Sequence, residues 1–381
     1  MTAGRPPLDG LRVLELARIL AGPWAGQLLS DLGATVVKVE SPEGDDTRRW
    51  GPPFIDHDGE SAAAYFHACN RGKRSVVADF ATQEGQETVR RLAAGADVVI
   101  ENFKLGGLDR YGLGWEALSA SNPRLVWCSI TGFGQDGPYA HRAGYDYIVQ
   151  GMSGLMSVTG DPGGEPQKVG VAVTDIFTGL YAATAILAAI HQRNATGTGQ
   201  RIDMALLDVA TAITANQAMN YLASGVAPMR MGNAHPNIVP YQVFSCADGH
   251  AIVAVGNDGQ FRRLCSLLGL EALASDPAYA TNPARLIHRA TLVPILQDAM
   301  LRLTRDDLLG RCEAQGVPAG PINDMADVFA DPQVVARRLR IDPDGVPGVR
   351  TPIVFSDASL SLDRASPRLG EHQDTLSAPW G

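Results

Sequence analysis

Short apolar runs alternate with amphipathic stretches through the first 205 residues of the chain. The apolar, mostly β-branched runs predict strands at residues 11–16, 35–39, 75–78, 97–100, 125–130 and 200–205. Helical periodicity occupies residues 23–32 and 83–94 between them. Strands that are apolar on both faces and alternate with helices form a parallel sheet with helices on both sides. The fold class predicted for residues 1–200 is therefore doubly wound α/β.

The pattern in the rest of the chain predicts a second, smaller domain. Helices expected at 145–159 and 176–192 and a long helix ending near 224 still belong to the first domain. The elements expected in the second domain are a hairpin of 241–245 and 251–255 and helices at 259–268, 284–303 and 305–315. Residues 225–240 are rich in turn-forming residues and predict a linker or a loop of the functional site. We therefore predict a large domain over residues 1–224, completed by residues 321–381, and a small α+β domain over residues 241–320.

Composition and charge exclude several kinds of partner. The chain carries 41 Asp and Glu residues against 32 Lys and Arg, which gives a formal charge of −9. This balance argues against a nucleic-acid partner, although a local basic cluster can still bind a small anion. The five cysteines are scattered and form no CxxC pair, so we expect reduced thiols and no metal site. Without an apolar signal segment or a bilayer-spanning run, a soluble cytoplasmic protein with no membrane partner is expected.

The turn after the first predicted strand does not match the dinucleotide-binding motif. Residues 17–23 read ARILAGP, with one glycine and a proline, whereas pyrophosphate binding at such a turn requires GxGxxG. The chain also lacks GxxxxGK[ST], the GxSxG elbow and HExxH. NAD enzymes, P-loop ATPases, serine hydrolases and zinc proteases are therefore disfavoured.

Six segments, in order and spacing, resemble those of a single family. They are LDGLRVLELARILAGPWAGQLLSDLGATVVKVE, GDDTRRWGPPF, FHACNRGKRSV, VIENFKLGGLDRYGLG, RAGYDYIVQGMSG and VAVTDIFTGLYAATAILAAI. Over about residues 8–355, and again in the tail RLGEHQDTL, the chain resembles the class III CoA-transferases of the CaiB/BaiF type. The resemblance implies an interlocked homodimer with a Rossmann-like large domain and a small domain. It also implies transfer of coenzyme A from an acyl-CoA to a free carboxylate, with the CoA thioester as substrate and no permanently bound cofactor or metal.

Asp175 matches the family's nucleophilic aspartate, within the segment VAVTDIFTG. By resemblance, its carboxylate attacks the thioester to form an aspartyl anhydride and then an aspartyl-CoA thioester. The sequence is compatible with this role, because apolar neighbours remove water from the carboxylate while a helix N-terminus stabilises its charge. The alternative interpretation is a simple helix N-cap, and one residue can fill both roles.

Basic residues in the predicted loops are candidates for binding the phosphates of CoA. The residues that match by resemblance are Arg18, Lys38, Asn102, Phe103 and Arg110, and those added for their charge and position are Lys73, Arg74 and Arg142. Ordinary surface charge is the alternative for any single lysine.

Tyr145 separates the transferases from a related class of enzyme. It matches a tyrosine near the reacting thioester, whereas the 2-methylacyl-CoA racemases of the same fold carry histidine in this segment. Racemisation requires a base that titrates near neutrality, and a tyrosine with a pKa of about 10 is a poor substitute. The transferase is therefore preferred, with a racemase or a non-catalytic acyl-CoA-binding protein as alternatives.

Loop sequences favour succinyl-CoA or another short dicarboxyl-CoA as the substrate. Leu20 stands where formyl-CoA:oxalate transferases have a glutamine. The loop 231–237 has one glycine where those transferases have a run of glycines. Both differences disfavour oxalate as the acceptor. The segments AHPNIVPY and VAVGNDGQF instead resemble the branch that acts on succinyl- or glutaryl-CoA.

Candidates for contacting the acyl group are Arg48, Arg49, Trp50 and His235. We expect one of the two arginines to pair with the distal carboxylate of a dicarboxylate substrate, because arginine binds carboxylates in a bidentate manner. The alternative is that both pair with the neighbouring acids Glu43, Asp45 and Asp46. His235 is either a substrate contact or a structural residue of its loop.

Overall fold

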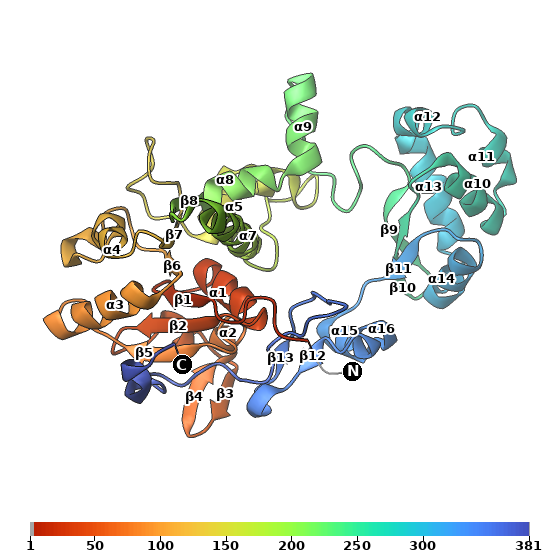
Figure 1. The fold of residues 1–381 in the computed structure, drawn as a ribbon. Coiled ribbons are helices and arrows are strands. Elements are labelled where there is room, and N and C mark those ends of the chain that lie inside the picture. Colours follow the sequence, from red (N-terminus) through yellow and green to blue (C-terminus); the bar gives the residue numbers. More distant parts are fainter. Residues whose placement is uncertain (1–3, 381) are drawn as a thin grey trace. The chain divides into compact units, whose positions relative to one another are not determined.

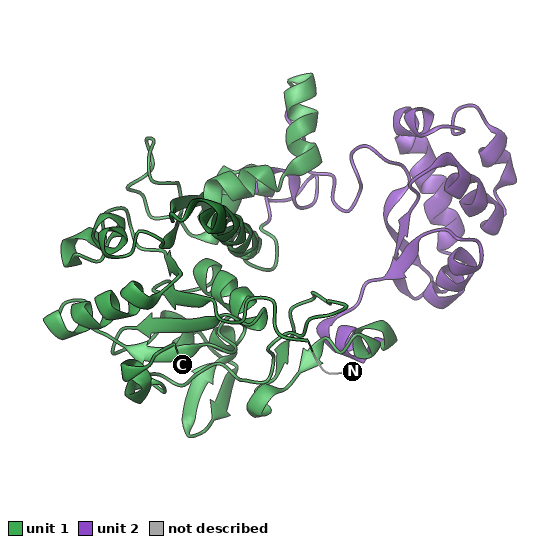
Figure 2. Cartoon of the chain, viewed as in Figure 1, with its two compact units in different colours: residues 1–155, 168–225, 332–381 green, residues 156–167, 226–331 purple. Residues whose placement is uncertain are grey.

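The computed structural model describes residues 4–380 and divides the chain into two compact units. The large unit comprises residues 1–155, 168–225 and 332–381, and the small unit comprises residues 156–167 and 226–331 (Figure 2). Compared with the predicted domains, the small unit gains residues 156–167 and the loop that starts at residue 226. The chain returns to the large unit at residue 332, later than expected.

A six-stranded parallel sheet forms the centre of the large unit (Figure 1). Its strands are β1 (Arg12–Glu15), β2 (Thr35–Glu40), β5 (Arg74–Val77), β6 (Val98–Glu101), β7 (Val126–Thr131) and β8 (Arg201–Ala205). The spatial order is β5-β2-β1-β6-β7-β8. Counted along the chain, this is the order 3-2-1-4-5-6 of a Rossmann sheet. The predicted parallel sheet is confirmed, and each strand lies within one residue of its expected position.

Helices cover both faces of this sheet. The helices that share one apolar core are α1 (Ala21–Asp31), α7 (Val173–Thr196) and α8 (Leu206–Ala212), and those that share the other are α3 (Gln83–Gly95) and α4 (Trp115–Ser121). In β1, Val13 joins the first core and Leu14 joins the second. A fully buried aliphatic side chain stabilises the fold by roughly 1.5–3 kcal/mol, so both faces of each strand must be apolar.

The long helix predicted to end near residue 224 is broken into two. α8 ends at Ala212 and α9 (Ala215–Ser224) begins three residues later. The Thr214 hydroxyl donates a hydrogen bond to the carbonyl of Thr211, and Ala215 has a φ of 44°. Threonine side chains that bond to nearby backbone groups compete with the helix, which explains the break.

A hairpin that is not among the predicted elements follows β2. It consists of β3 (Phe54–His57) and β4 (Glu60–Ala63), and it leads into the short helix α2 (Ala64–His67). Both turn residues, Asp58 and Gly59, have positive φ values of 47° and 83°. An Asp-Gly pair is the usual sequence of such a turn, so the signal was present.

The C-terminal segment returns to the large unit through three short elements: α16 (Pro332–Ala336), β12 (Arg340–Ile341) and β13 (Gly348–Val349). Its end covers the edge strand β5, where the Val77 N–H donates to Gln373 Oε1 at 2.8 Å. The His372 N–H donates to the carbonyl of Ser75 at 2.9 Å. The tail thus satisfies backbone groups that an open edge strand would leave unpaired.

The small unit is built on the predicted hairpin. Its antiparallel sheet has the order β11-β10-β9, with β9 (Tyr241–Cys246), β10 (Gly249–Ala254) and β11 (Ala319–Pro321). Its helices are α10 (Asp258–Leu267), α11 (Glu271–Ser275), α12 (Asn282–Ile287), α13 (Arg289–Met300), α14 (Arg305–Ala314) and α15 (Met325–Ala330). Phe244, Phe261 and Leu292 are fully buried in its core.

The remaining short elements are α5 (Asp146–Met152), α6 (Leu155–Val158) and 3-10 turns, of which η1 (Asp46–Arg49) is the first. α7 is long and apolar enough, by length and composition, to cross a membrane. Ala182, Ala183 and Ile186 of this helix lie in the core beneath the sheet, however, and the core helix of a folded domain meets the same criterion.

Candidate active site

A cavity of about 520 Å³ lies within the large unit, at the carboxyl edge of the parallel sheet. It adjoins the ends of β1 and β6, where the strand order reverses and where sheets of this type bind ligands. Its wall includes the turn 18–21 after β1, residues 102–105 after β6, and the segment 142–145. The structure therefore brings together seven of the predicted site residues: Arg18, Asn102, Phe103, Arg110, Arg142, Tyr145 and Asp175.

Asp175 is the third residue of α7 and faces this cavity. The helix has Ala172 at its N-cap, so the alternative interpretation of Asp175 as the N-cap is wrong. Burial, and after it the negative charge of Asp146, raises the pKa of Asp175 to about 7. A carboxylate of this basicity is a stronger nucleophile near neutral pH than an ordinary surface aspartate.

The cations of the cavity wall are Arg18, Lys104, Arg110 and Arg142. Arg142 lies over the ring of Tyr139, with 4.5 Å between the guanidinium carbon and the ring centre. Arg110 lies over the ring of Tyr111 at the same distance. Cation–π contacts hold a guanidinium in place while leaving its N–H groups free to bind an anion. This part of the cavity is therefore suited to a ligand that carries phosphates or carboxylates.

The turn after β1 is held in a strained conformation by two side chains. The Arg18 N–H donates to Asn102 Oδ1 at 2.9 Å, and Asn102 Nδ2 donates back to the Arg18 carbonyl at 2.7 Å. The next residue, Ile19, has a φ of 73°, which costs a β-branched residue on the order of 1–3 kcal/mol. The Ile19 N–H donates to the Asp45 carboxylate at 3.2 Å. Asn102, predicted as a ligand contact, thus also supports the wall of the cavity.

Lys38 and Lys73 do not line the cavity, which corrects the prediction that they bind the ligand. Lys38 Nζ lies 2.9 Å from Asp45 Oδ2 and 3.2 Å from Glu15 Oε1. Lys73 Nζ lies 2.8 Å from Glu15 Oε2 and 2.8 Å from Asn70 Oδ1. Both lysine side chains are fully buried, so these ammonium groups are balanced inside the protein and do not reach a bound phosphate.

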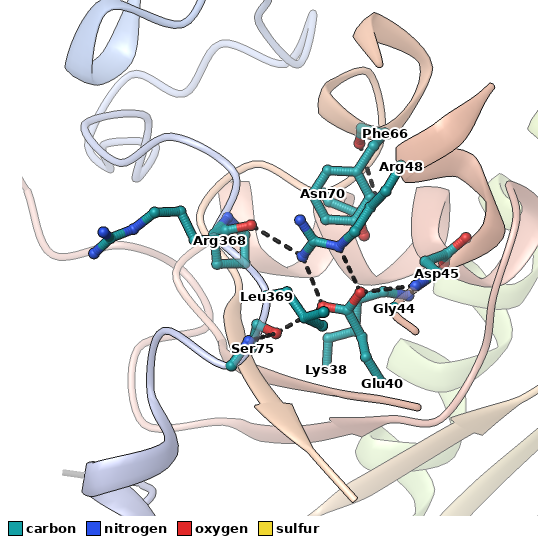
Figure 3. A network of polar contacts seen from close by, with 12 residues as sticks. Lys38, Glu40, Gly44, Asp45, Arg48, Phe66, Asn70, Ser75, Arg368 and Leu369 are labelled. Atoms are coloured by element: carbon teal, nitrogen blue, oxygen red, sulfur yellow. Dashed lines mark hydrogen bonds and ion pairs between the residues drawn. The ribbon is translucent and has the colours of Figure 1, made fainter. Parts of the chain in front are cut away.

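Arg48 is also a structural residue, which corrects its predicted role at the acyl group (Figure 3). Its Nε and Nη2 atoms donate to the two carboxylate oxygens of Glu40, each at 2.8 Å, and its Nη1 atom donates to Glu60 at 2.8 Å. The guanidinium lies over the ring of Phe66, 3.7 Å from its centre. Nη2 also donates to the carbonyl of Pro367, so every nitrogen of this buried side chain is bonded within the protein and Arg48 is a structural residue.

Arg74 lies on the edge strand β5 and is not part of the cavity wall, contrary to its predicted contact with CoA. Its Nη1 atom donates to the carbonyl of Pro379 at 2.7 Å, which ties the C-terminal tail to the sheet.

Arg49 and Trp50 lie outside the cavity wall but are linked to it. Arg49 is exposed, and its Nη2 atom is 3.5 Å from Asp46, which also pairs with Arg18 at 3.0 Å. The ring of Trp50 packs edge-on against Tyr65 at 5.4 Å. Burial, and after it the charge of Asp175, raises the pKa of Tyr65 to about 12, so Tyr65 lies within electrostatic range of Asp175.

His235 lies in the small unit and makes local contacts there. Its Nδ1 atom accepts a hydrogen bond from the Asn237 N–H at 3.0 Å, and its ring is 5.2 Å from that of Tyr241. These contacts fit the structural interpretation of this loop histidine, and its predicted contact with substrate stays a prediction.

Comparison with known proteins supplies the family. The model of one protein family, described as CoA-transferase family III, matches residues 8–373. A succinate–glutarate CoA-transferase of Agrobacterium fabrum is 62% identical over 382 residues, covering 98% of this chain and 96% of that protein. The chain belongs to CoA-transferase family III. The family and the enzyme class predicted from the sequence are thus confirmed.

Two further relatives of this CoA-transferase agree with the assignment. The succinyl-CoA:glutarate CoA-transferase of Mus musculus is 43% identical over 372 residues, covering 96% of this chain and 84% of that protein. A solved structure described as a CaiB/BaiF family protein from Brucella suis is 64% identical, with a TM-score of 0.90, and covers 99% of this chain and 100% of its own.

Three residues near the CoA-transferase cavity were not among the sequence predictions: Lys104, Asp146 and Tyr65. Lys104 directly follows Asn102 and Phe103 at the end of β6, so its position gave a usable signal. Tyr65 and Asp146 gave none, because their relation to Asp175 depends on how α2, α5 and α7 pack. In residues 4–380, no group of three or more His, Cys, Asp or Glu side chains is arranged to hold a metal ion.

The support that Asn102 gives to the turn predicts a binding defect. We expect Asn102→Ala to raise the KM for acyl-CoA about tenfold, because two hydrogen bonds of about 1 kcal/mol each are lost from a strained turn. Steady-state kinetics would measure this. The control is Asn122→Ala, which removes side-chain bonds away from the cavity: those that Nδ2 donates to the carbonyls of Ala93 and Ala96 and the one that Oδ1 accepts from the Arg124 N–H. Equal KM values for the two variants would contradict the prediction.

Proposed function

We propose that the enzyme moves CoA between succinyl-CoA, or another short dicarboxyl-CoA, and a free carboxylate, with Asp175 as the covalent nucleophile. The observation that carries this proposal is the position of Asp175 in a cavity lined by cations, with its pKa raised to about 7 by burial and by Asp146. The names of the relatives from Agrobacterium fabrum and Mus musculus support the choice of substrates.

The proposed reaction is balanced without any added reagent. The Asp175 carboxylate oxygen attacks the thioester carbonyl carbon, the C–S bond breaks, and CoA leaves as a thiolate with its electron pair. The thiolate then attacks the Asp175 carbonyl of the mixed anhydride, which releases the donor acid as a carboxylate and leaves an aspartyl-CoA thioester. The acceptor carboxylate attacks this thioester to give a second anhydride. The returning thiolate attacks the acceptor's carbonyl, which forms the new CoA ester and regenerates Asp175.

The cavity supplies groups suited to CoA and its acyl chain. Arg18, Lys104, Arg110 and Arg142 are the proposed partners of the phosphates, because their charges face one cavity. Tyr145 is 60% exposed on the same wall, and Phe103 offers an apolar ring. Thiolate and carboxylate leaving groups are both anions, so the surrounding cations favour their departure.

Arg49 is the proposed partner of the distal carboxylate of a dicarboxylate, since Arg48 is fully engaged elsewhere. It is exposed, and it is connected to Arg18 of the cavity through Asp46. Leu20 lines the cavity where a glutamine stands in formyl-CoA:oxalate transferases, which supports the choice of a longer acceptor than oxalate.

A homodimer is part of the proposal, and exposed apolar residues support it. On α7, Phe177, Leu180 and Tyr181 follow one another at helical spacing and are all exposed. α5, which contacts α7, exposes Tyr147 and Ile148, and α9, which contacts α8, exposes Met219, Tyr221 and Leu222, with Leu222 at 72%. Monomeric proteins rarely leave so many large apolar side chains in water, so a second copy of this chain is the proposed cover. An interlocked arrangement is proposed on the family resemblance.

A cytoplasmic location is proposed on the state of the cysteines. All five (Cys69, Cys128, Cys246, Cys265 and Cys312) are buried and unpaired. Disulfides form in oxidising compartments, so a set of free thiols fits a reducing one.

The experiment that tests the function is label transfer followed by mass spectrometry. The enzyme is incubated in D₂O with a panel of acyl-CoAs, including 2-methylacyl esters, and with isotope-labelled succinate, glutarate and oxalate. We expect the label of glutarate or succinate to appear in a new CoA ester, and oxalate to be a poor acceptor. Deuterium gained at the α carbon of a 2-methylacyl ester, without label transfer, would instead establish a racemase. If acyl-CoA binds but neither label transfer nor deuterium gain occurs, the chain would be an acyl-CoA-binding protein without this activity.

A further inference from the structure

The N-terminus of α7, which carries Asp175, has no cap of its own. The residue at the N-cap is Ala172, whose methyl side chain cannot accept a hydrogen bond. The first turn of any helix leaves four N–H groups without intrahelical partners. Thr174, in this first turn, is fully buried, so its N–H needs an acceptor from elsewhere in the fold.

That acceptor is Asp146, the first residue of α5. Its Oδ1 atom accepts the backbone N–H of Thr174 at 2.8 Å and also the Thr174 hydroxyl. Thr174 is fully buried and directly precedes Asp175. A carboxylate from a different helix thus caps α7 one residue before the proposed nucleophile.

The second oxygen of Asp146 fixes the segment that leads into α7. Oδ2 accepts a hydrogen bond from Gln150 Nε2 at 2.7 Å, and Gln150 Oε1 accepts the N–H of Val169 at 2.9 Å. Gln150 is also fully buried. Both oxygens of Asp146 are therefore used to hold the approach to Asp175, and neither helix can shift without breaking a buried bond.

Asp146 also acts on Asp175 through its charge. The titratable groups that face Asp175 include Tyr65 from α2, Tyr145, and the four cations of the cavity wall, Arg18, Lys104, Arg110 and Arg142. Positive charge close to a carboxylate would favour its ionised form. Burial opposes ionisation most strongly, and the charge of Asp146 opposes it next. Asp146 is thus the nearby charge that makes Asp175 more basic.

We infer that Asp146 is a positioning residue for the transfer reaction. From the neighbouring helix α5 of the same chain, it caps α7 and keeps a negative charge beside the nucleophile. This inference rests on the proposed function, because it presumes that Asp175 performs the attack. Its consequence is that part of the Asp175 population is protonated at neutral pH. A carboxylate with more basic oxygens attacks a thioester faster once ionised, and the cost is a loss of activity on mild acidification.

The first test is the pH profile of kcat/KM between pH 5 and 9, with succinyl-CoA and glutarate. Wild-type activity is expected to fall as the pH drops below about 7. Asp146→Asn keeps an acceptor oxygen for Thr174 but removes the charge. The acid limb of the profile, which is the fall of kcat/KM at low pH, should therefore move down by roughly half to one pH unit. Asp146→Glu keeps the charge, so its limb should stay close to that of the wild type. An unmoved limb in Asp146→Asn would overturn the inference.

Thr174→Val is the matched control for the structural role. It removes the hydroxyl bond to Asp146 but keeps both the backbone bond and the charge. We expect it to lower the melting temperature while leaving the acid limb where the wild type has it. A limb that moves equally in Thr174→Val and Asp146→Asn would mean that Asp146 acts only through structure, and would overturn the electrostatic half of the inference.

A second readout does not depend on catalysis. The difference in free energy of unfolding between wild type and Asp175→Ala follows the titration of Asp175. Because the folded pKa lies above the ordinary value of 3.8, this difference should fall as the pH rises and should level off near pH 7. In the Asp146→Asn background it should level off at a lower pH. If the levelling point moves to a lower pH in the Asp146→Asn background but the enzyme transfers no CoA, only the proposed function is refuted. If CoA is transferred but both backgrounds level off at the same pH, only the inference is refuted.

Discussion

Asp175→Ala is expected to lower the rate of CoA transfer by about four orders of magnitude or more. Removal of a covalent nucleophile forces a different reaction path, and losses of about 10⁴ to 10⁶ are typical. The rate of label transfer from acyl-CoA to glutarate would measure the loss. Mass spectrometry of peptides from an acid-quenched wild-type reaction should in addition show CoA attached to the peptide that contains Asp175.

Two controls separate lost chemistry from lost structure. Binding of free CoA, followed by calorimetry, should persist in Asp175→Ala, because Arg18, Arg110 and Arg142 are unchanged. Stability at pH 8 should equal or exceed that of the wild type, because the wild-type carboxyl is ionised there in a site that disfavours its charge. Near-normal transfer by this variant would remove Asp175 from the mechanism.

Lys38→Met is expected to lower the free energy of unfolding by about 3–5 kcal/mol. Lys38 and Lys73 balance Glu15 and Asp45 in a buried group of two positive and two negative charges. Burial by itself would raise the pKa of Asp45, but the neighbouring Lys38 ammonium lowers it to about 2. Loss of this ammonium leaves an unbalanced negative charge in the protein interior. Urea denaturation followed by circular dichroism would measure the change.

The charge balance can be restored by a second substitution. Lys38→Met combined with Asp45→Asn leaves the pair of Glu15 and Lys73, so this double variant should recover part of the lost stability. Lys168→Met provides a surface control, since Lys168 is exposed and makes only a contact with the carbonyl of Val169. A loss below about 1 kcal/mol in Lys38→Met would show that the buried charges contribute little.

The sequence predicted the parallel sheet well because its strands are buried on both faces. Residues such as Val13 and Leu14 pack in opposite cores, so both had to be apolar, and the run was visible without any tertiary information. The small-unit hairpin was visible for a similar reason, since Asp248 and Gly249 mark its turn. The break between α8 and α9 was not visible, because Thr214 fits a helix equally well until its hydroxyl bonds to the backbone.

Cavity residues were predicted most reliably where they followed a strand. Arg18 comes after β1 and Asn102 and Phe103 come after β6, and the ends of neighbouring parallel strands meet at one edge of the sheet. The errors concern charged residues that lie in a strand, directly before one, or in the 3-10 turn after β2, namely Lys38, Arg48, Lys73 and Arg74. A charge in a sequence is normally read as exposed, and these side chains instead bond to groups inside the protein or to its tail.

The sequence by itself determined the alternation of elements, the family and the position of Asp175, because each depends on residue types in a fixed order. Only the tertiary structure decided which charges serve the cavity and which serve the interior. Glu15, Lys38 and Lys73 lie in or next to three separate strands, and with Asp45 they balance one another only after β1, β2 and β5 have paired. Asp146 reaches the start of α7 from 28 residues away for the same reason. Partners so distant along the chain meet through packing, which local sequence patterns do not encode.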